Sequence, residues 1–209
     1  MSTPTLTAGS KATVLVDLLP QSSVRSRAIT RDIVLVLGFA LLTAAAAQVQ
    51  FSLGFTPVPL TGQTFAVLLS GAALGMRRGI ASQALYWGLG LTGLPFYAGG
   101  DGGWQNGTGS TLGYFVGFIV AAGVIGKLAE RRHDREVMSS LAAMAFGTVI
   151  IYAFGALWLA HNLNIPVANG EANAIAYGVT PFLVGDLLKM ALAGLLTPLA
   201  WATVSSKGK

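Results

Sequence analysis

The chain has 209 residues, of which 53% are hydrophobic and only 10% are charged, and its mean hydropathy is +0.65. Because a soluble domain carries roughly 25% charged residues, this composition indicates a membrane protein. The sequence contains no cysteine, which excludes disulfides, thiolate metal sites and a cysteine nucleophile. A formal charge of +5 favours nucleic-acid binding in a soluble protein, but in a membrane protein the positions of the charges set the topology, so no nucleic-acid partner is expected.

Six apolar stretches predict an all-α membrane protein, a bundle of six transmembrane helices. They cover residues 33–51, 63–76, 80–97, 111–128, 139–159 and 179–204. Several are shorter than the roughly 20 residues that cross a bilayer upright, so we expect irregular or sheltered helices in the middle of the bundle. The chain then divides into an N-terminal tail (1–30), a six-helix domain (31–204) and a C-terminal tail (205–209).

The basic residues predict the orientation of this bundle. Every Lys and Arg except Lys189 lies before the first span, after the last span or in two alternate loops, and the three opposite loops contain none. By the positive-inside rule, both tails are expected to be cytoplasmic. One of the basic loops, residues 127–136, is a charge run that we expect to be a solvated turn whose basic side chains meet anionic lipid. His133 and His161 have no second ligand at metal spacing, so no metal site is expected.

Two short patterns precede the first outer loop. Residues 12–20 form an apolar patch in the N-terminal tail, interrupted by Asp17, and they suggest a short interfacial helix. Ala40 and Ala44 lie four residues apart in the first span, which gives a small-residue face for close helix contact. Spacing alone does not decide whether the partner is a helix of this chain or another subunit. The chemistry of the residues slightly favours a helix of this chain.

The first outer loop is apolar and contains two prolines. Pro57, Val58 and Pro59 form a semi-rigid extended strip, because proline fixes φ and disfavours helix at the preceding residue. A plain connector is the alternative, but a loop in water has no reason to carry so many apolar side chains unless they cover something. We therefore expect a cap over a cavity.

The second outer loop, residues 93–106, combines glycines with aromatic and amide side chains. Tyr97 and Trp104 offer flat apolar surfaces, while Gln105 and Asn106 offer hydrogen-bond donors and acceptors. Aromatic residues also gather at membrane interfaces without binding anything, so either one alone has two interpretations.

The last span contains Asp186 and Lys189, the ionisable pair that the predicted topology places within the hydrocarbon. They lie three residues apart and thus on one helical face, roughly 10 and 15 Å from the outer end of the span at 1.5 Å per residue. One interpretation is an ion pair that neutralises both groups and stabilises the packing of the bundle. The other is a ligand cavity, in which the carboxylate accepts N–H bonds and the ammonium meets an anion.

Taken together, these motifs resemble the BioY family, the substrate-capture (S) components of energy-coupling factor (ECF) transporters for biotin. The resemblance runs from about residue 33 to residue 204. The residues that carry it are Pro57–Phe65, Gly93–Phe96 with the glycines after them, Gly113-Tyr114 with Gly117-Phe118, and Pro181-Phe182 with Gly185-Asp186 and Lys189.

The resemblance implies high-affinity biotin capture from outside by a multi-pass protein of a prokaryotic plasma (inner) membrane. It also implies a transmembrane coupling subunit and two cytoplasmic ATPase subunits as partners. Because the chain has no Walker A sequence, we expect the ATPase subunits to use the ATP, and we expect no cofactor in this chain. On the same basis the proline strip is a lid, and the Ala40–Ala44 face docks the coupling subunit. The expected substrate-binding residues are Asp186, Lys189, Tyr97, Trp104, Gln105, Asn106, Gln63 and Tyr114.

Three other functions fit the residues less well. The first is an S component for another vitamin. The second is a stand-alone carrier in which Asp186 exchanges protons, and the third is an intramembrane enzyme that uses Asp186 as an acid or base. The enzyme hypothesis lacks a second catalytic carboxylate, a Ser–His pair or a metal set within the spans, so we do not expect catalysis.

Overall fold

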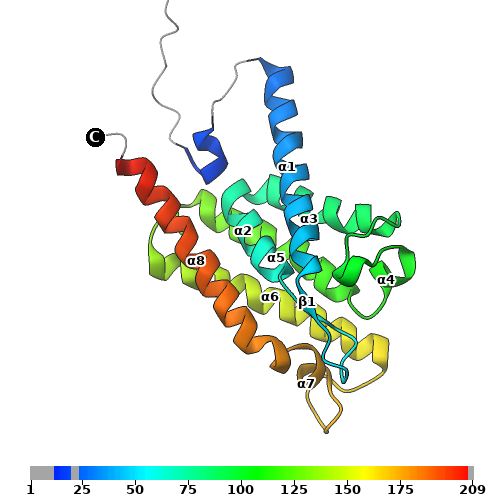
Figure 1. Cartoon of the computed structure of the whole chain (residues 1–209). Helices are drawn as coiled ribbons and strands as arrows, with labels where there is room; N and C mark the ends of the chain where they lie inside the picture. Colours follow the sequence, from blue (N-terminus) through cyan, green and yellow to red (C-terminus); the bar gives the residue numbers. More distant parts are fainter. Residues whose placement is uncertain (1–11, 20–23, 207–209) are drawn as a thin grey trace, which may run out of the picture.

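The structure is a computed structural model that describes residues 12–19 and 24–206, most of which are helical (Figure 1). Residues 1–11, 20–23 and 207–209 lie outside this part, so half of the predicted N-terminal tail and the last three residues of the C-terminal tail are not covered. The described elements are η1 (Leu15–Leu18), α1 (Arg25–Gln48), β1 (Gln50–Phe51), β2 (Leu60–Thr61), α2 (Gln63–Leu74), α3 (Met76–Leu91), η2 (Ala98–Gly100), α4 (Trp104–Thr108), α5 (Leu112–Glu130), α6 (Val137–Leu163), α7 (Ala174–Gly178), η3 (Thr180–Phe182) and α8 (Leu183–Ser206). The small β1–β2 hairpin was not expected from an all-α prediction.

Four segments of the described chain are long and apolar enough to cross a membrane. They are Arg25–Gln48, Leu112–Glu130, Val137–Leu163 and Ala174–Thr203. The other two predicted stretches correspond to α2 and α3, which have 12 and 16 residues. At 1.5 Å per residue these helices are only about 18 and 24 Å long, less than the roughly 30 Å of a hydrocarbon core. The described residues thus form a membrane protein with four full-length helices, and the two short helices are in the middle of the chain, where irregular or sheltered helices were expected.

The boundary between α2 and α3 lies at a single glycine. Gly75 has a φ of 82°, a left-handed conformation that ends α2 and lets α3 begin at the next residue. The sequence predicts a loop at residues 77–79 and a following helix that ends at residue 97, and both boundaries differ from those of the structure. Gly93, with a φ of 98°, follows the actual end of α3 at Leu91. Residues 92–97 are therefore free to contribute to the outer loop.

Helix α5 lies in the middle of the bundle and contacts α2, α3 and α6. Glycines permit these close approaches. A methyl group on Gly113 would lie 2.3 Å from the carbonyl oxygen of Phe154 in α6, and one on Gly126 would lie 2.4 Å from the backbone of Gly75. Larger residues at either position would force the helices apart.

The small-residue face of α1 packs inside the chain. Ala40 is fully buried and Ala44 is 7% exposed, and both belong to a core cluster that includes Val67 of α2 and Tyr86 of α3. The exposed apolar side chains of α1, such as Leu41, lie elsewhere on the helix. Because their surface is already covered by this chain, Ala40 and Ala44 are not free to dock another subunit. The expectation of a docking face at these two residues is corrected in favour of intrachain packing.

The segment before α1 also packs against the helices. Val14 and Val16 are buried in a cluster with Leu74 of α2, and the Arg78 guanidinium of α3 lies 3.4 Å from the Asp17 carboxylate. In Figure 1, η1 lies near the same end of the molecule as the C-terminal end of α8. The patch predicted to be an interfacial helix is thus a four-residue 3₁₀ helix, η1, held on the protein.

The charge run at residues 127–136 is only partly solvated. Asp134 is buried, and its carboxylate accepts a hydrogen bond of 2.6 Å from the Trp201 indole N–H of α8. Burial raises the pKa of this carboxyl above its ordinary value. The Arg135 guanidinium stacks 4.0 Å from the centre of the Trp201 ring. The prediction of a plain solvated turn is therefore wrong for these two residues, which fasten the α5–α6 loop to α8.

Candidate ligand pocket

A cavity of about 410 Å³ lies between the β1–β2 hairpin, the loop before α5 and the helices α2, α5, α6 and α8. The hairpin and α7 are at the end of the bundle away from η1 (Figure 1). A volume between about 300 and 1,000 Å³ is typical of sites for small organic ligands. The lining combines aromatic rings with amides, hydroxyls, two carboxylates and one ammonium.

The Asp186 carboxylate is the polar centre of this cavity. It accepts hydrogen bonds from the Lys189 ammonium (2.6 Å), the Tyr152 hydroxyl (2.7 Å) and the Thr64 hydroxyl (2.9 Å). The Asp186 and Lys189 side chains are only 5% and 17% exposed. The two interpretations of this pair are thus compatible, because the ion pair forms and both of its members also line the cavity.

Two lining residues, Gln63 of α2 and Tyr114 of α5, are held by hydrogen bonds to other parts of the protein. The Gln63 amide donates to the Tyr86 hydroxyl and accepts from the Thr61 hydroxyl at 2.7 Å. The Tyr114 hydroxyl donates to the Gly178 carbonyl oxygen at 2.6 Å. Gln63 and Tyr114 are therefore held in fixed orientations, and Tyr114 presents its ring to the cavity with its hydroxyl already bonded.

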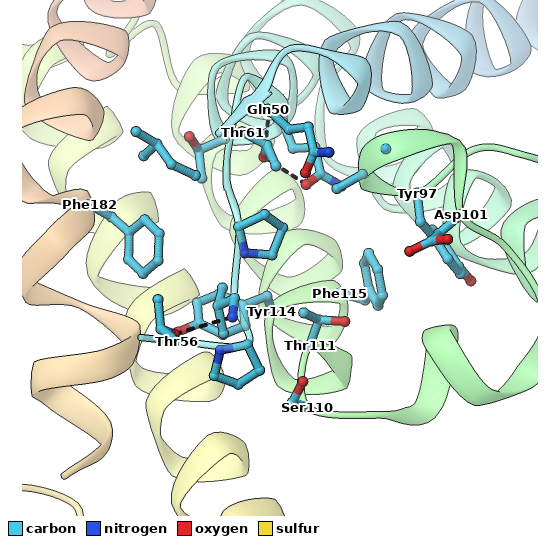
Figure 2. Close-up of a pocket in the computed structure, with 18 of the residues that line it drawn as sticks. Gln50, Thr56, Thr61, Tyr97, Asp101, Ser110, Thr111, Tyr114, Phe115 and Phe182 are labelled. Atoms are coloured by element: carbon cyan, nitrogen blue, oxygen red, sulfur yellow. Dashed lines mark hydrogen bonds between the residues drawn. The ribbon is translucent and has the colours of Figure 1, made fainter. Parts of the chain in front are cut away.

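The proline strip lies across the cavity. Figure 2 shows the chain between Thr56 and Thr61 passing between Phe182 on one side and Tyr97 and Asp101 on the other. The side chain of Val58 is buried, and the Thr56 hydroxyl donates a 2.8 Å hydrogen bond to the backbone of α7. Pro57, Val58 and Pro59 all line the cavity.

The second outer loop supplies one side of the cavity. Tyr97, Gln105 and Asn106 line it, and the Tyr97 ring stacks on Phe115 with centroids 4.8 Å apart. Burial raises the pKa of the Tyr97 phenol to about 12, so the phenol stays neutral. Trp104, by contrast, is 70% exposed and does not line the cavity. Its contact with a ligand therefore stays a prediction, and its exposed position suits a membrane interface.

The structure thus brings together most of the residues that the sequence singled out. One cavity is lined by the three lid residues and by Asp186, Lys189, Tyr97, Gln105, Asn106, Gln63 and Tyr114. Trp104, Ala40 and Ala44 do not line it. Sequence reasoning missed two partners of Asp186, Thr64 and Tyr152, and the loop residue Asp101. Thr64 and Tyr152 are polar groups in apolar helices, and that pattern is the signal that was available for them.

This arrangement defines a class of protein: a helical membrane protein with a small-ligand pocket at one end, covered by a hairpin. A residue set of this kind binds an amphipathic molecule with a polar end near the ion pair and an apolar body against the rings.

The comparisons with known proteins agree with this class. The BioY family matches residues 15–206, and the chain belongs to that family. It is 37% identical to "Biotin transporter BioY" of Rhizobium etli, over 80% of this chain and 91% of the relative, and 36% identical to "Probable biotin transporter BioY" of Pyrococcus horikoshii, over 79% and 93%.

A solved structure has the same fold. The crystal structure of the S component for biotin from an ECF-type ABC transporter covers 85% of this chain and 93% of its own, with a TM-score of 0.73 and 22% sequence identity. The overall fold of the bundle is therefore a known architecture.

Proposed function

We propose that the chain is a biotin-capture S component of an ECF-type transporter. The observation that carries this proposal is the Asp186–Lys189 pair in a capped, aromatic-lined cavity of a BioY-family chain. Relatives named as biotin transporters, one of them 37% identical, support the choice of ligand.

The chemistry of the cavity suits each part of biotin. The ureido ring carries two N–H donors and a carbonyl, for which the amides at Gln105 and Asn106 are partners. The apolar thioether ring fits the rings of Tyr114 and Phe115. The ligand's carboxylate is expected to bind the Lys189 ammonium. This group has three N–H donors and uses one of them for Asp186, so donors remain for the ligand.

The proline strip is proposed as the lid. It is tied to α7 by Thr56 and closed by Val58, so opening requires the loss of one hydrogen bond and the exposure of one apolar side chain. These are small costs, on the order of 1 kcal/mol for the hydrogen bond and 1.5–3 kcal/mol for the buried side chain. The strip is thus weakly enough held to open for ligand entry.

We further propose six membrane crossings with both tails cytoplasmic, in a prokaryotic plasma membrane. The basic residues on one side support this orientation. The short helices α2 and α3 are proposed as the other two crossings, because α1 and α5 pack against both of them. Energy for uptake is expected from a transmembrane coupling subunit and two ATPase subunits. With Ala40 and Ala44 buried, the coupling subunit has to meet other surfaces of the bundle.

An uptake assay tests the transport role. Vesicles that contain the chain, the coupling subunit and the ATPases are loaded with ATP and given labelled biotin outside. We expect accumulation that stops when the ATPase subunits carry inactivating substitutions. Accumulation by the chain alone that collapses with the proton gradient would favour the stand-alone carrier, and product formation from biotin would favour an enzyme.

Competition in the same assay tests the ligand. Unlabelled biotin in excess is expected to abolish accumulation, while thiamine and riboflavin leave it unchanged. Displacement by either of these vitamins, with biotin ineffective, would assign the chain to another vitamin.

A further inference from the structure

A second cavity of about 490 Å³ lies on the outside of the bundle, between α3 and α5. Its walls are almost entirely apolar side chains, and it shares no residue with the ligand pocket. The lining residues are Met76, Ile80, Ile119, Val120, Gly123, Val124, Lys127, Leu128 and Arg131. The groove owes its depth to Gly123, where a methyl group would lie 2.8 Å from the Ile80 side chain.

The two charged residues of this groove lie at one end of it. Lys127 is in the last turn of α5 and Arg131 directly follows that helix, whereas Ile119 marks the other end. Both basic side chains are exposed. Glu130 is the nearby acid; it lies 3.3 Å from Lys127 and also accepts a hydrogen bond from the backbone N–H of Met76. Arg131 forms no ion pair within the described residues, so the end of the groove retains positive charge.

The dimensions of the groove match half a bilayer. Ile119 and Arg131 are twelve residues apart, which at 1.5 Å per residue corresponds to about 18 Å along α5. One leaflet contributes roughly 15 Å of hydrocarbon, half of the roughly 30 Å core. With the basic end at the head-group level, the apolar part of the groove therefore reaches about as far as one acyl chain.

We propose that this groove binds an anionic glycerophospholipid of the leaflet at the basic end. An acyl chain lies between α3 and α5 against Ile80 and Val120, and the phosphate lies between Lys127 and Arg131. Charge complementarity selects the head group, because a zwitterionic lipid offers the same acyl chain without the net negative charge. An apolar helix from another subunit would fill the walls but supply no negative charge for Arg131, which forms no ion pair within the described residues.

Native mass spectrometry of the full-length chain tests this proposal. The protein is released from mixed nanodiscs of phosphatidylglycerol and phosphatidylcholine, and the lipids that stay bound are counted. We expect one retained phosphatidylglycerol in preference to phosphatidylcholine. The double variant K127Q/R131Q is expected to reduce that retention at least fivefold.

The matched control removes the same charge elsewhere. R25Q/R27Q neutralises two exposed arginines of α1 that are outside the groove and is expected to retain the lipid. Equal losses in both double variants would overturn the proposal, because they would mean general attraction to basic residues. Unchanged retention in K127Q/R131Q would overturn it as well.

A charge-neutral variant covers the case in which K127Q/R131Q unfolds. Val124→Trp fills the groove, and we expect it to reduce retention at least fivefold with an unchanged unfolding temperature. Retention equal to that of the unmodified chain would overturn the proposal. A photoreactive side chain at position 124 is expected to cross-link to lipid in membranes that hold the whole transporter, and cross-links to protein instead would assign the groove to a partner subunit.

Discussion

Replacing Asp186 by asparagine keeps the size of the side chain but removes the charge that Lys189, Tyr152 and Thr64 share. The asparagine amide nitrogen then faces at least one of these donors, and Lys189 loses its counter-ion. We expect the D186N chain to be less stable and to bind biotin more weakly than the unmodified chain.

The structure sets the size of both effects. Asp186 is buried and Lys189 is half-buried, with side chains 5% and 17% exposed, and the removal of one partner from a fully buried pair costs about 3–5 kcal/mol. We take the lower end, about 3 kcal/mol, because the cavity is open to the ligand and thus to water. A lost hydrogen bond to a charged group costs about 1.5–3 kcal/mol, which corresponds to roughly a 10- to 150-fold weaker affinity.

The assay is thermal unfolding of the detergent-purified chain, together with biotin titration. D186N/K189M removes both charges and should regain most of the stability that D186N loses, because no buried charge is left unpaired, yet it should not regain binding. Asp101→Asn is the stability control, since this loop carboxylate is exposed and accepts no hydrogen bond within the described residues. Unfolding of D186N within about 0.5 kcal/mol of the unmodified chain would refute the reasoning.

Two other predictions concern the bundle and its N-terminal segment. Gly113→Ala should destabilise the chain by about 1–3 kcal/mol, because the new methyl group overlaps α6. Gly88 has open space around it, so Gly88→Ala should stabilise the chain by up to about 1 kcal/mol. Equal effects of the two variants in thermal unfolding would contradict the described packing. Burial alone raises the pKa of Asp17, but hydrogen bonds from Thr13 and the backbone, with nearby Arg78, hold it below its ordinary value. The carboxylate therefore stabilises the segment above the ordinary aspartate range and loses this effect as the pH falls through the lowered pKa. The variant Val16→Cys introduces the chain's single cysteine, at a buried position. This thiol should react slowly with a thiol reagent at neutral pH, and several-fold faster when Asp17 is also replaced by asparagine. Equal reaction rates would show that the Asp17 carboxylate does not hold the segment on the bundle.

The sequence predicted the chemistry of the site better than its geometry. A carboxylate and an ammonium three residues apart in an apolar span require a polar destination, so Asp186 and Lys189 were identifiable from composition and spacing alone. Their partners were not, because Thr64 and Tyr152 come from α2 and α6, and only the packing of the bundle brings those helices to α8.

The failures have the same origin in tertiary packing. Ala40 and Ala44 form a face that suits any close helix contact, and spacing does not distinguish a partner subunit from α2 and α3 of the same chain. Asp134 belongs to a charge run that resembles a solvated turn, but Trp201, 67 residues further along the chain, covers it. A sequence window contains no information about such distant neighbours.

Equilibrium titration of the purified chain with biotin, without ATP or partner subunits, is the direct test of biotin capture by this chain. We expect saturable binding of one biotin per chain, weakened at least tenfold in D186N/K189M, a double variant whose folding is checked by thermal unfolding. Folded protein that does not bind biotin, or a double variant that binds it as tightly as the unmodified chain, would show that the cavity around Asp186 and Lys189 is not a biotin site.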